Sequence, residues 1–433
     1  MTTSVSPTWE QLPILVLTKV LNYLQLMDRL VAGKVCQSWL KALDSPSLWR
    51  TISIHFDRDV FVLNELLIEV AHRYGHYTTK LELDWSNPQI HFIFQRGLGV
   101  SFLDTLYQKK VQIEELTLKE FGFHYRWTFR HRLNIVLNQF LRCQNNLKLF
   151  RMMNEHVRPN DVLRLVNVIA QSCGHVLRQV DLGNALKKVQ PFHSIPRLIE
   201  SISRLSVLTD LSINYNVLSD GILQAMATAN SNLINFNIVV SDTLSWNAPL
   251  SERAWQQLNN SCPNLQVFLK IEKFSHFEEL VPILAPNIPL RRFHLYSGRH
   301  WDQRIIRDLR SSLSLLINQY SSTLVDLIIS VKNNREMLDD LILELIDKCV
   351  KLEDLQFNGV IRDFEIIREI FEYFKAKNVT KFKTFNLHPR EINSRNREII
   401  REIMTDHREY FNRNDLNYSI GENQIQSVFY YYM

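Results

Sequence analysis

A short pattern of apolar and polar residues returns along most of the chain. Apolar residues stand at its first, fourth and sixth positions, as in IEELTL at 113–118, LRQVDL at 177–182 and LTDLSI at 208–213. The last three positions read apolar, polar, apolar, which is the period of a β-strand with one buried face. The pattern therefore predicts many short strands, each apolar on one side.

The spacing of these segments indicates a repeat. Their central apolar positions are 81, 116, 150, 180, 211, 236, 268, 293, 327, 355 and 385. Helix-like stretches separate them, for example 161–172 and 336–348, and the average step is about 30 residues. Strand, loop and helix at this period are typical of a leucine-rich-repeat solenoid, whose units bury their apolar faces against one another. We expect an α/β fold with a curved solenoid of about 10–11 irregular strand-helix repeats.

The first fifty residues have a helical pattern instead. Pro13 suits the first turn of a helix, where its missing N–H costs nothing, and Asp28 is suited to cap a second helix. Apolar stripes at helical spacing are formed by Leu17, Leu21 and Leu24, and then by Val31, Val35 and Trp39. Three helices of this size bury too little area to be stable alone, so their apolar side chains require a neighbour.

This region resembles the F-box family. The matching elements are Leu12-Pro13, Tyr23-Leu24, Asp28, Val35-Cys36-x-x-Trp39 and Leu48-Trp49, in the family's order and spacing over about residues 9–50. The resemblance implies a three-helix F-box that docks onto the Skp adaptor of a cullin–RING ubiquitin ligase. It implies as adaptor contacts Leu12, Pro13, Leu17, Leu24, Cys36, Trp39 and Trp49, with Leu12 and Trp49 divided between contact and support. The other interpretation is a helical cap that these side chains close over the rest of this chain.

Ile14 and Leu15 depart from the family, which often has acidic residues after Leu-Pro. An acidic residue at a helix N-terminus contributes roughly 0.3–1 kcal/mol, and this chain lacks it. The replacement adds apolar surface. We expect it to alter adaptor affinity and to leave the fold unchanged.

Four cysteines precede predicted strands by three or four residues: Cys143, Cys173, Cys262 and Cys349. This resembles the cysteine-containing leucine-rich repeats common in F-box proteins. We expect each to pack as a small apolar side chain at the end of a helix, because cysteines spread over four coils cannot converge on one metal ion. Of the positions where the family often has a coil-linking asparagine, only the one at Asn216 is filled, which predicts irregular turns between coils.

The composition and the cysteines indicate the cellular compartment. The chain has 433 residues, 45% hydrophobic and 22% charged, with a net charge of +5. An odd set of five scattered cysteines argues against a disulfide framework, and we see no secretory signal or apolar run of membrane-spanning length. We expect a cytoplasmic or nuclear protein with no membrane partner.

Motifs for catalysis are not apparent. The sequence has no phosphate-binding Gly-rich loop, His-Glu-x-x-His or Gly-x-Ser-x-Gly. His72 and His76 have the spacing of a metal pair, although a solvated pair is the simpler interpretation. The stretch 123–133 interleaves basic and aromatic residues, which could stack on nucleic acid or pack on adjacent coils. We expect no catalytic residue, metal, cofactor or nucleic-acid partner.

The polar positions of the strands would form the binding face of the solenoid. Arg292, His294 and Tyr296 make the most distinctive cluster, able to stack and to hold an acidic group. Further candidates for substrate binding are Asn214, Gln356 and His388. The aromatic tail 426–433 would cap the last coil or fold back onto this face.

The expected organisation is a flexible N-terminus (1–8), an F-box (9–50), a connecting helical segment (51–77), a leucine-rich solenoid (78–410) and a C-terminal cap or tail (411–433). The resemblance implies a non-catalytic substrate-recognition subunit of a Skp–cullin–F-box ubiquitin ligase. Its partners would be the Skp adaptor, through it the cullin and RING subunits, and an unidentified protein target. The alternative is an adaptor-bound interaction scaffold without a degradation target.

Overall fold

A computed structural model gives the structure of the chain. The residues it describes are 9–56, 60–85, 99–120, 127–153, 158–187, 191–229, 232–241, 249–273, 276–297, 308–333, 336–377, 382–390, 392–414 and 417–421. They fall into two compact units. The first contains the residues up to Ile213 together with 228–233, and the second contains 214–227 and the residues from Ile234 onward.

The first unit begins with short helices. They are η1 (Trp9–Gln11), α1 (Ile14–Asn22), α2 (Leu26–Ala32), α3 (Gln37–Leu43) and η2 (Pro46–Leu48). Leu17, Leu21 and Leu43 form a small core between them. Helix α2 starts after Gln25, so Asp28 lies inside its first turn and does not cap it as we had expected. The carboxylate is still placed favourably for the helix dipole.

Strands and helices alternate through the rest of the first unit. The strands are β1 (Thr51–His55), β2 (Lys80–Asp84), β3 (Glu115–Lys119), β4 (Leu149–Met153), β5 (Gln179–Asp181) and β6 (Asp210–Asn214), each parallel to the next. The helices are α4 (Val60–Tyr74), η3 (Gly75–Tyr77), α5 (Val100–Gln108), α6 (Trp127–Arg142), α7 (Pro159–Cys173), η4 (Gly183–Leu186) and α8 (Pro191–Ser203).

The second unit continues the same alternation. Its strands are β7 (Asn235–Val240), β8 (Gln266–Ile271), β9 (Leu290–Tyr296), β10 (Asp326–Ser330), β11 (Asp354–Gly359), β12 (Thr384–Pro389) and β13 (Asn417–Ile420), paired in parallel in chain order. Its helices are η5 (Tyr215–Val217), α9 (Asp220–Ala229), α10 (Glu252–Ser261), α11 (Phe277–Leu280), α12 (Leu309–Tyr320), α13 (Asp339–Lys348), α14 (Glu365–Lys377) and α15 (Ser394–Asn414).

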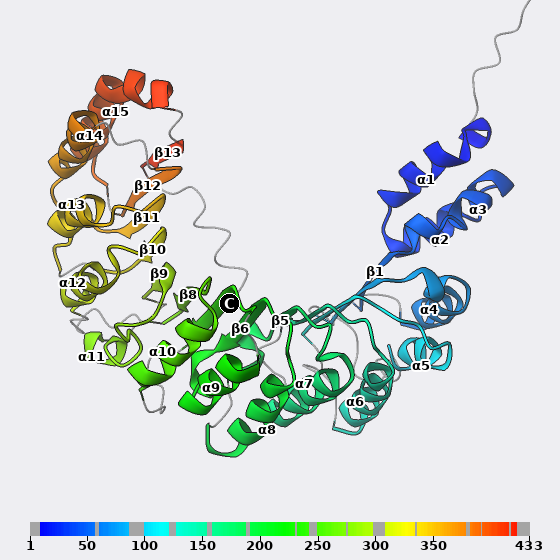
Figure 1. Cartoon of the computed structure of the whole chain (residues 1–433). Helices are drawn as coiled ribbons and strands as arrows, with labels where there is room; N and C mark the ends of the chain where they lie inside the picture. Colours follow the sequence, from blue (N-terminus) through cyan, green and yellow to red (C-terminus); the bar gives the residue numbers. More distant parts are fainter. Residues whose placement is uncertain are drawn as a thin grey trace, which may run out of the picture. The chain divides into compact units, whose positions relative to one another are not determined.

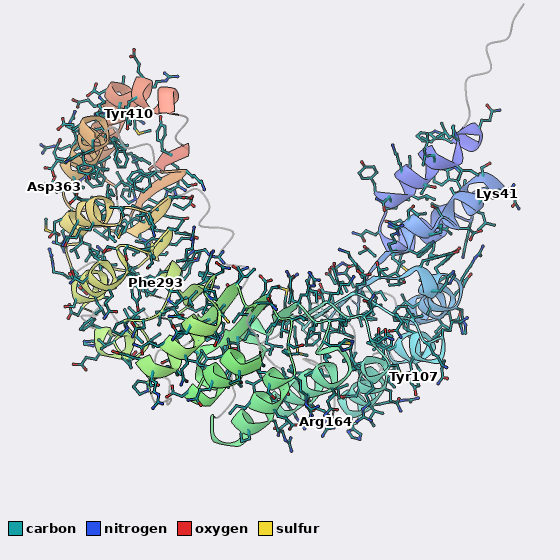
Figure 2. All side chains as sticks on the ribbon, in the orientation of Figure 1. Lys41, Tyr107, Arg164, Phe293, Asp363 and Tyr410 are labelled. Atoms are coloured by element: carbon teal, nitrogen blue, oxygen red, sulfur yellow. The ribbon has the colours of Figure 1, made fainter. Side chains whose placement is uncertain are left out.

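The predicted α/β solenoid of parallel strands and intervening helices is confirmed. In β3, Leu116 and Leu118 are fully buried, while Thr117 between them is half-exposed. In the second unit the helices lie on one side of the strands, and no described helix lies on the other (Figure 1). The apolar positions therefore face the helices, as with the buried Phe293 labelled in Figure 2. The polar positions form an open strand face.

Two strands fall outside the range predicted for repeats. Strand β1 lies within 51–77, where we expected a connecting helical segment, and it pairs with β2 over its whole length. Strand β13 lies within 411–433, and α15 extends past residue 410. Both strands lack the leading leucine of the repeat pattern, since they read TISIH and NYSI. Backbone pairing with a neighbouring strand needs no leucine, so these coils escape a search for the motif.

The predicted core position at 268 is wrong by one residue. In β8 the buried residues are Val267, Leu269 and Ile271, so Phe268 lies on the open strand face. The pairing of β8 with β9 is irregular between Val267 and Phe268. A shift of one residue moves each side chain to the opposite face of a strand. An aromatic ring therefore lies among polar neighbours at this point.

Three of the four cysteines that precede strands are buried, as predicted. Cys173, Cys262 and Cys349 are buried, but Cys143 is exposed. The neighbouring Gln144 is buried in that coil instead. Its amide nitrogen donates to the Val111 and Phe140 carbonyls at 3.0 and 3.2 Å, and its oxygen accepts from the Ile113 N–H at 2.9 Å. A glutamine thus links coils where the pattern predicted a thiol.

An asparagine that sequence reasoning missed links two coils in the second unit. Asn333 is 2% exposed. Its side-chain oxygen accepts from the Val360 N–H at 2.7 Å, and its nitrogen donates to the Val360 carbonyl at 2.8 Å and the Glu336 carbonyl at 3.2 Å. Backbone groups at a turn between coils are satisfied in this way without a regular strand.

Candidate protein-binding surfaces

Large apolar side chains are exposed mainly on the N-terminal helices. Of thirteen that are exposed among the described residues, seven lie between residues 9 and 35. They are Trp9, Ile14, Leu15, Val16, Tyr23, Val31 and Val35, which we call the N-terminal apolar surface. Tyr23 is 91% exposed and Leu15 is 70% exposed. Such a concentration on one small region is typical of a protein-binding site.

The predicted adaptor contacts separate into two groups. Pro13 is exposed, and the half-buried members are Leu12, Leu24, Cys36 and Trp39. By contrast, Leu17 and Trp49 are fully buried within this chain. Because a buried side chain has no surface to offer, Leu17 supports the helices, which corrects the expectation for it, and Trp49 takes the supporting role of the two that were expected for it. The exposed Val35, Tyr23 and Leu15 were not among the predicted contacts.

The buried side chain of Arg29 links α2 to the end of α1 and to η2. Its guanidinium donates to the Leu21 carbonyl at 3.2 Å, to the Leu24 carbonyl at 3.1 Å and to the Leu48 carbonyl. Its Cζ also lies 5.7 Å from the centre of the Trp49 ring. Burial lowers the pKa of Arg29 from its ordinary value. Three carbonyl partners compensate for the loss of water around this charge, so Arg29 fixes where α1 and η2 meet α2.

Trp49 connects the N-terminal helices to the first strand-helix repeat. Its ring stacks on Tyr74 of α4, with centroids 4.0 Å apart and planes 3° from parallel. Asp44 accepts hydrogen bonds from the Tyr74 hydroxyl at 3.0 Å and from Arg73 at 2.8 Å. Burial, followed by the bond to Asp44, raises the pKa of Tyr74, which therefore stays a donor at neutral pH. The helices are thus held against α4 by stacking and directed bonds.

Ion pairs cover the open strand face in the first unit. They join Lys119 to Glu82 at 2.6 Å, Lys80 to Glu115 at 2.7 Å and Arg151 to Asp181 at 3.4 Å. Each pair spans two adjacent strands, so opposite charges lie next to each other across the ladder. This part of the strand face therefore neutralises its own charges.

The open face of β8 and β9 has a different character. The guanidinium of Arg292 lies over the Phe268 ring at 4.8 Å, and His294 meets the same ring edge-on at 4.5 Å. Lys270 Nζ is 5.9 Å from the centre of the Tyr296 ring. We call Phe268, Lys270, Arg292, His294 and Tyr296 the strand-face cluster. It brings together the three residues that the sequence grouped and adds two from β8.

The other predicted substrate-binding residues lie elsewhere. Asn214 is 1% exposed, and its side-chain nitrogen donates to Ser241 Oγ at 3.3 Å, so it is a buried link and not part of a binding face. Gln356 of β11 and His388 of β12 are half-buried on the open face. His388 Nδ1 lies 3.3 Å from the Gly421 carbonyl. These two remain candidates separate from the strand-face cluster.

Comparison with known proteins identifies the N-terminal region. A family model described as the F-box domain matches residues 9–51. Over 313 residues the chain is 21% identical to the F-box/LRR-repeat protein 21 of Bos taurus, covering 69% of this chain and 67% of that protein. The chain thus contains an F-box domain, and the parallel strand-helix repeats that follow it are of the leucine-rich type. The N-terminal apolar surface is thus the exposed apolar surface of the F-box.

The described residues show neither a metal site nor a membrane-spanning helix. These residues contain no group of three or more His, Cys, Asp or Glu side chains placed to hold a metal ion, and His72 and His76 are both exposed. In the same part of the chain, no helix combines the length and apolar character that crossing a membrane requires.

Two segments that the sequence singled out are described in part or not at all. The basic and aromatic stretch at 123–133 enters α6 at Trp127, where Leu133 is buried and Arg132 is exposed. Its first residues, 123–126, lie outside the described chain, as does the aromatic tail 426–433.

Proposed function

We propose that this protein is a substrate receptor of a Skp–cullin–F-box ubiquitin ligase. Its F-box binds the Skp adaptor, and the open strand face of its repeats binds a protein target. F-box proteins with leucine-rich repeats typically serve as non-catalytic subunits of such ligases. The cullin and RING subunits are reached through the adaptor, and ubiquitin transfer takes place on those other subunits.

The N-terminal apolar surface is the observation on which adaptor binding rests. Exposed apolar side chains lose their contact with water when a partner covers them, and each large one contributes about 1.5–3 kcal/mol when fully buried. The strand faces offer less of this surface, because their exposed positions are mostly polar. The adaptor contacts are therefore Leu12, Pro13, Leu24, Cys36 and Trp39 together with the exposed residues around them.

The receptor acts by proximity. When it holds adaptor and target at once, the target's lysines are confined near the charged conjugating enzyme, and their effective concentration rises without a catalytic residue on this chain. The close packing of Trp49 on Tyr74 serves this role, because it holds the F-box firmly against the first repeat. All five cysteines are free, which suits action in the reducing cytosol or nucleus.

Two matched valines test adaptor binding. Val35 in the F-box is 68% exposed, and Val350 in the second unit is 64% exposed. Val35→Glu would place an unpaired carboxylate in the adaptor interface, and we expect at least about a tenfold loss of affinity for the purified Skp adaptor. Val350→Glu makes the same chemical change outside the F-box and should bind as the wild type does.

Binding is measured by titration of the full chain with adaptor, with melting temperatures to show that both variants fold. Equal affinity for both variants, or an intact chain that does not bind the adaptor, would refute the proposed interface. Val35→Glu, which leaves the contact of Trp49 with Tyr74 in place, then separates a receptor from a scaffold in cells. If the protein delivers targets for degradation, the proteins bound by its repeats should accumulate; unchanged levels of all of them would favour the scaffold.

A further inference from the structure

Arg292 lacks the ion pair that four other cations of the strand faces make. Lys80, Lys119 and Arg151 each lie against a carboxylate of an adjacent strand, at 2.6–3.4 Å. Lys270 is paired with Glu272 at 3.1 Å. Arg292, by contrast, forms no ion pair with any residue that the structure describes, and its guanidinium lies over the Phe268 ring.

The reason lies in the pairing of β9 with β10. Asp326 stands directly opposite Arg292 in the register of the two strands. Its carboxylate instead lies against His294, with Oδ2 3.2 Å from Nε2. The acidic residue that could have neutralised Arg292 is thus held by the imidazole, and the guanidinium remains over the aromatic ring.

Stacking prepares Arg292 for a bidentate ligand. A guanidinium held over an aromatic ring makes this contact without using its N–H donors, so two of them can still reach both oxygens of one carboxylate. The contact with Phe268 also restricts the side chain before any ligand arrives, which reduces the entropy lost on binding. Arg292 is exposed, so a ligand can reach these donors.

Apolar side chains lie along the same face on both sides of β9. Phe268, Tyr296 and Ile328 are half-exposed at outward positions of β8, β9 and β10, and Ile328 pairs with His294 across the ladder. Val239 of β7 is also outward-facing, opposite Lys270. A ligand seated here would therefore contact one charged fork and several apolar surfaces at once.

We propose that the strand-face cluster binds a segment of the target protein in which a carboxylate side chain stands beside an apolar one. Arg292, held on the Phe268 ring, takes the carboxylate through two hydrogen bonds, while Ile328 and Tyr296, further along the strands, contact the apolar side chain. This inference rests on the proposed receptor function and deepens it by naming the kind of target segment that the repeats select.

Charges around Arg292 favour a carboxylate over a phosphate. Asp326 of β10 lies opposite Arg292, and Asp354 of β11 lies opposite Asp326. Glu272 directly follows β8. A carboxylate brings one negative charge, which one arginine can neutralise. A phosphate brings about −1.5 to −2 charges and would be repelled by these acidic neighbours. Tyr296 stays protonated here, because burial and then Asp326 and Glu272 raise its pKa, so it adds no charge.

The experiment starts from a display library of random twelve-residue peptides selected on the full chain. Peptides enriched by the wild type should carry Asp or Glu at a fixed spacing from an apolar residue. Synthetic copies are then titrated with Glu or Asp replaced by Gln or Asn, or by phosphoserine. Removal of the carboxylate should weaken binding about ten- to a hundredfold, the range for a charge-assisted hydrogen-bonded pair. Phosphoserine should bind more weakly than the carboxylate.

Protein variants complete the test. Arg292→Gln should lose the same factor and no longer distinguish Glu from Gln in the peptide, whereas Arg292→Lys should restore only part of the affinity. Arg151→Gln removes a strand-face arginine that is already paired with Asp181, and it should leave binding unchanged.

No enrichment of acidic peptides, equal binding by Arg292→Gln, or tighter binding of phosphoserine would each overturn the assignment. The adaptor affinity of Arg292→Gln is measured in parallel and should equal that of the wild type. If the peptide test fails while the adaptor binds normally, only the role of the strand-face cluster is refuted. If the wild type does not bind the adaptor, the proposed function is refuted.

Discussion

The F-box and the repeats expose different kinds of side chain. Seven of the thirteen exposed large apolar residues in the described chain lie in the short stretch from Trp9 to Val35. The repeats expose mostly polar positions, many joined in ion pairs such as Lys119–Glu82. Apolar area contributes affinity without fine direction, whereas placed polar groups contribute specificity. The contrast fits one constant partner at the F-box and one selected partner at the strand face.

The largest effect should come from a pair of neighbouring leucines in α1. Leu17 is fully buried, and Leu15 is 70% exposed. Leu17→Ala should lower the free energy of unfolding by about 2–5 kcal/mol, because it leaves a cavity in the F-box core. Leu15→Ala should change it by less than about 0.5 kcal/mol. Chemical denaturation followed by tryptophan fluorescence measures both, and equal losses would show that α1 is not divided into a core face and a free face.

For adaptor affinity, the order of the two leucines should be reversed among variants that remain folded. Leu15→Ala removes apolar area from the N-terminal apolar surface, and we expect its dissociation constant for the adaptor to rise about tenfold. Val281, exposed in the second unit, provides the control: Val281→Ala should bind the adaptor normally. Titration calorimetry with purified adaptor compares the two, and a similar loss for Val281→Ala would contradict confinement of the interface to the F-box.

A smaller effect is expected where polar groups hold the repeats together. Asn333→Ala removes three hydrogen bonds and leaves the Val360 N–H and carbonyl without this partner, which should cost about 1–3 kcal/mol. Asn386, half-buried on the open face of β12, is the matched control, and Asn386→Ala should cost less than about 0.5 kcal/mol. Denaturant unfolding separates them, and an unaffected Asn333→Ala would remove the role assigned to this asparagine.

The ion pairs of the strand face should contribute least. Lys119→Ala breaks a 2.6 Å pair with Glu82 whose side chains are both about one-third exposed. Such partly exposed pairs contribute about 0–1 kcal/mol, and salt screens them further. The stability difference between Lys119→Ala and the wild type should therefore shrink as sodium chloride is added. A loss well above 1 kcal/mol, or one that salt does not change, would show that this face is more than a solvated surface.

The sequence predicted the repeats well because their signal is periodic. Every coil with a leading leucine was placed, since the alternation that makes the pattern visible also buries the strand. Strands β1 and β13 were missed because backbone pairing, not leucine, recruits them. Phe268 was assigned to the core because a register shift of one residue leaves no trace in composition.

The candidate sites were predictable only in part. Arg292, His294 and Tyr296 could be grouped because outward positions of one strand share a face. Neither the stacking partner Phe268 nor the capture of Asp326 by His294 could be read from the sequence, since both depend on contacts between strands. Arg29 was missed for a similar reason. Its partners are three carbonyls from two segments, the end of α1 and η2, and no local pattern marks such an assembly.

The most direct test of the account is the thermodynamics of adaptor binding to the full chain. Titration calorimetry at several temperatures gives the heat-capacity change, and repetition at several salt concentrations gives the ionic contribution. We predict a large negative heat-capacity change and an affinity that hardly depends on salt, because burial of the N-terminal apolar surface drives association. Binding with a heat-capacity change near zero and a steep dependence on salt would contradict the account, as would the absence of binding.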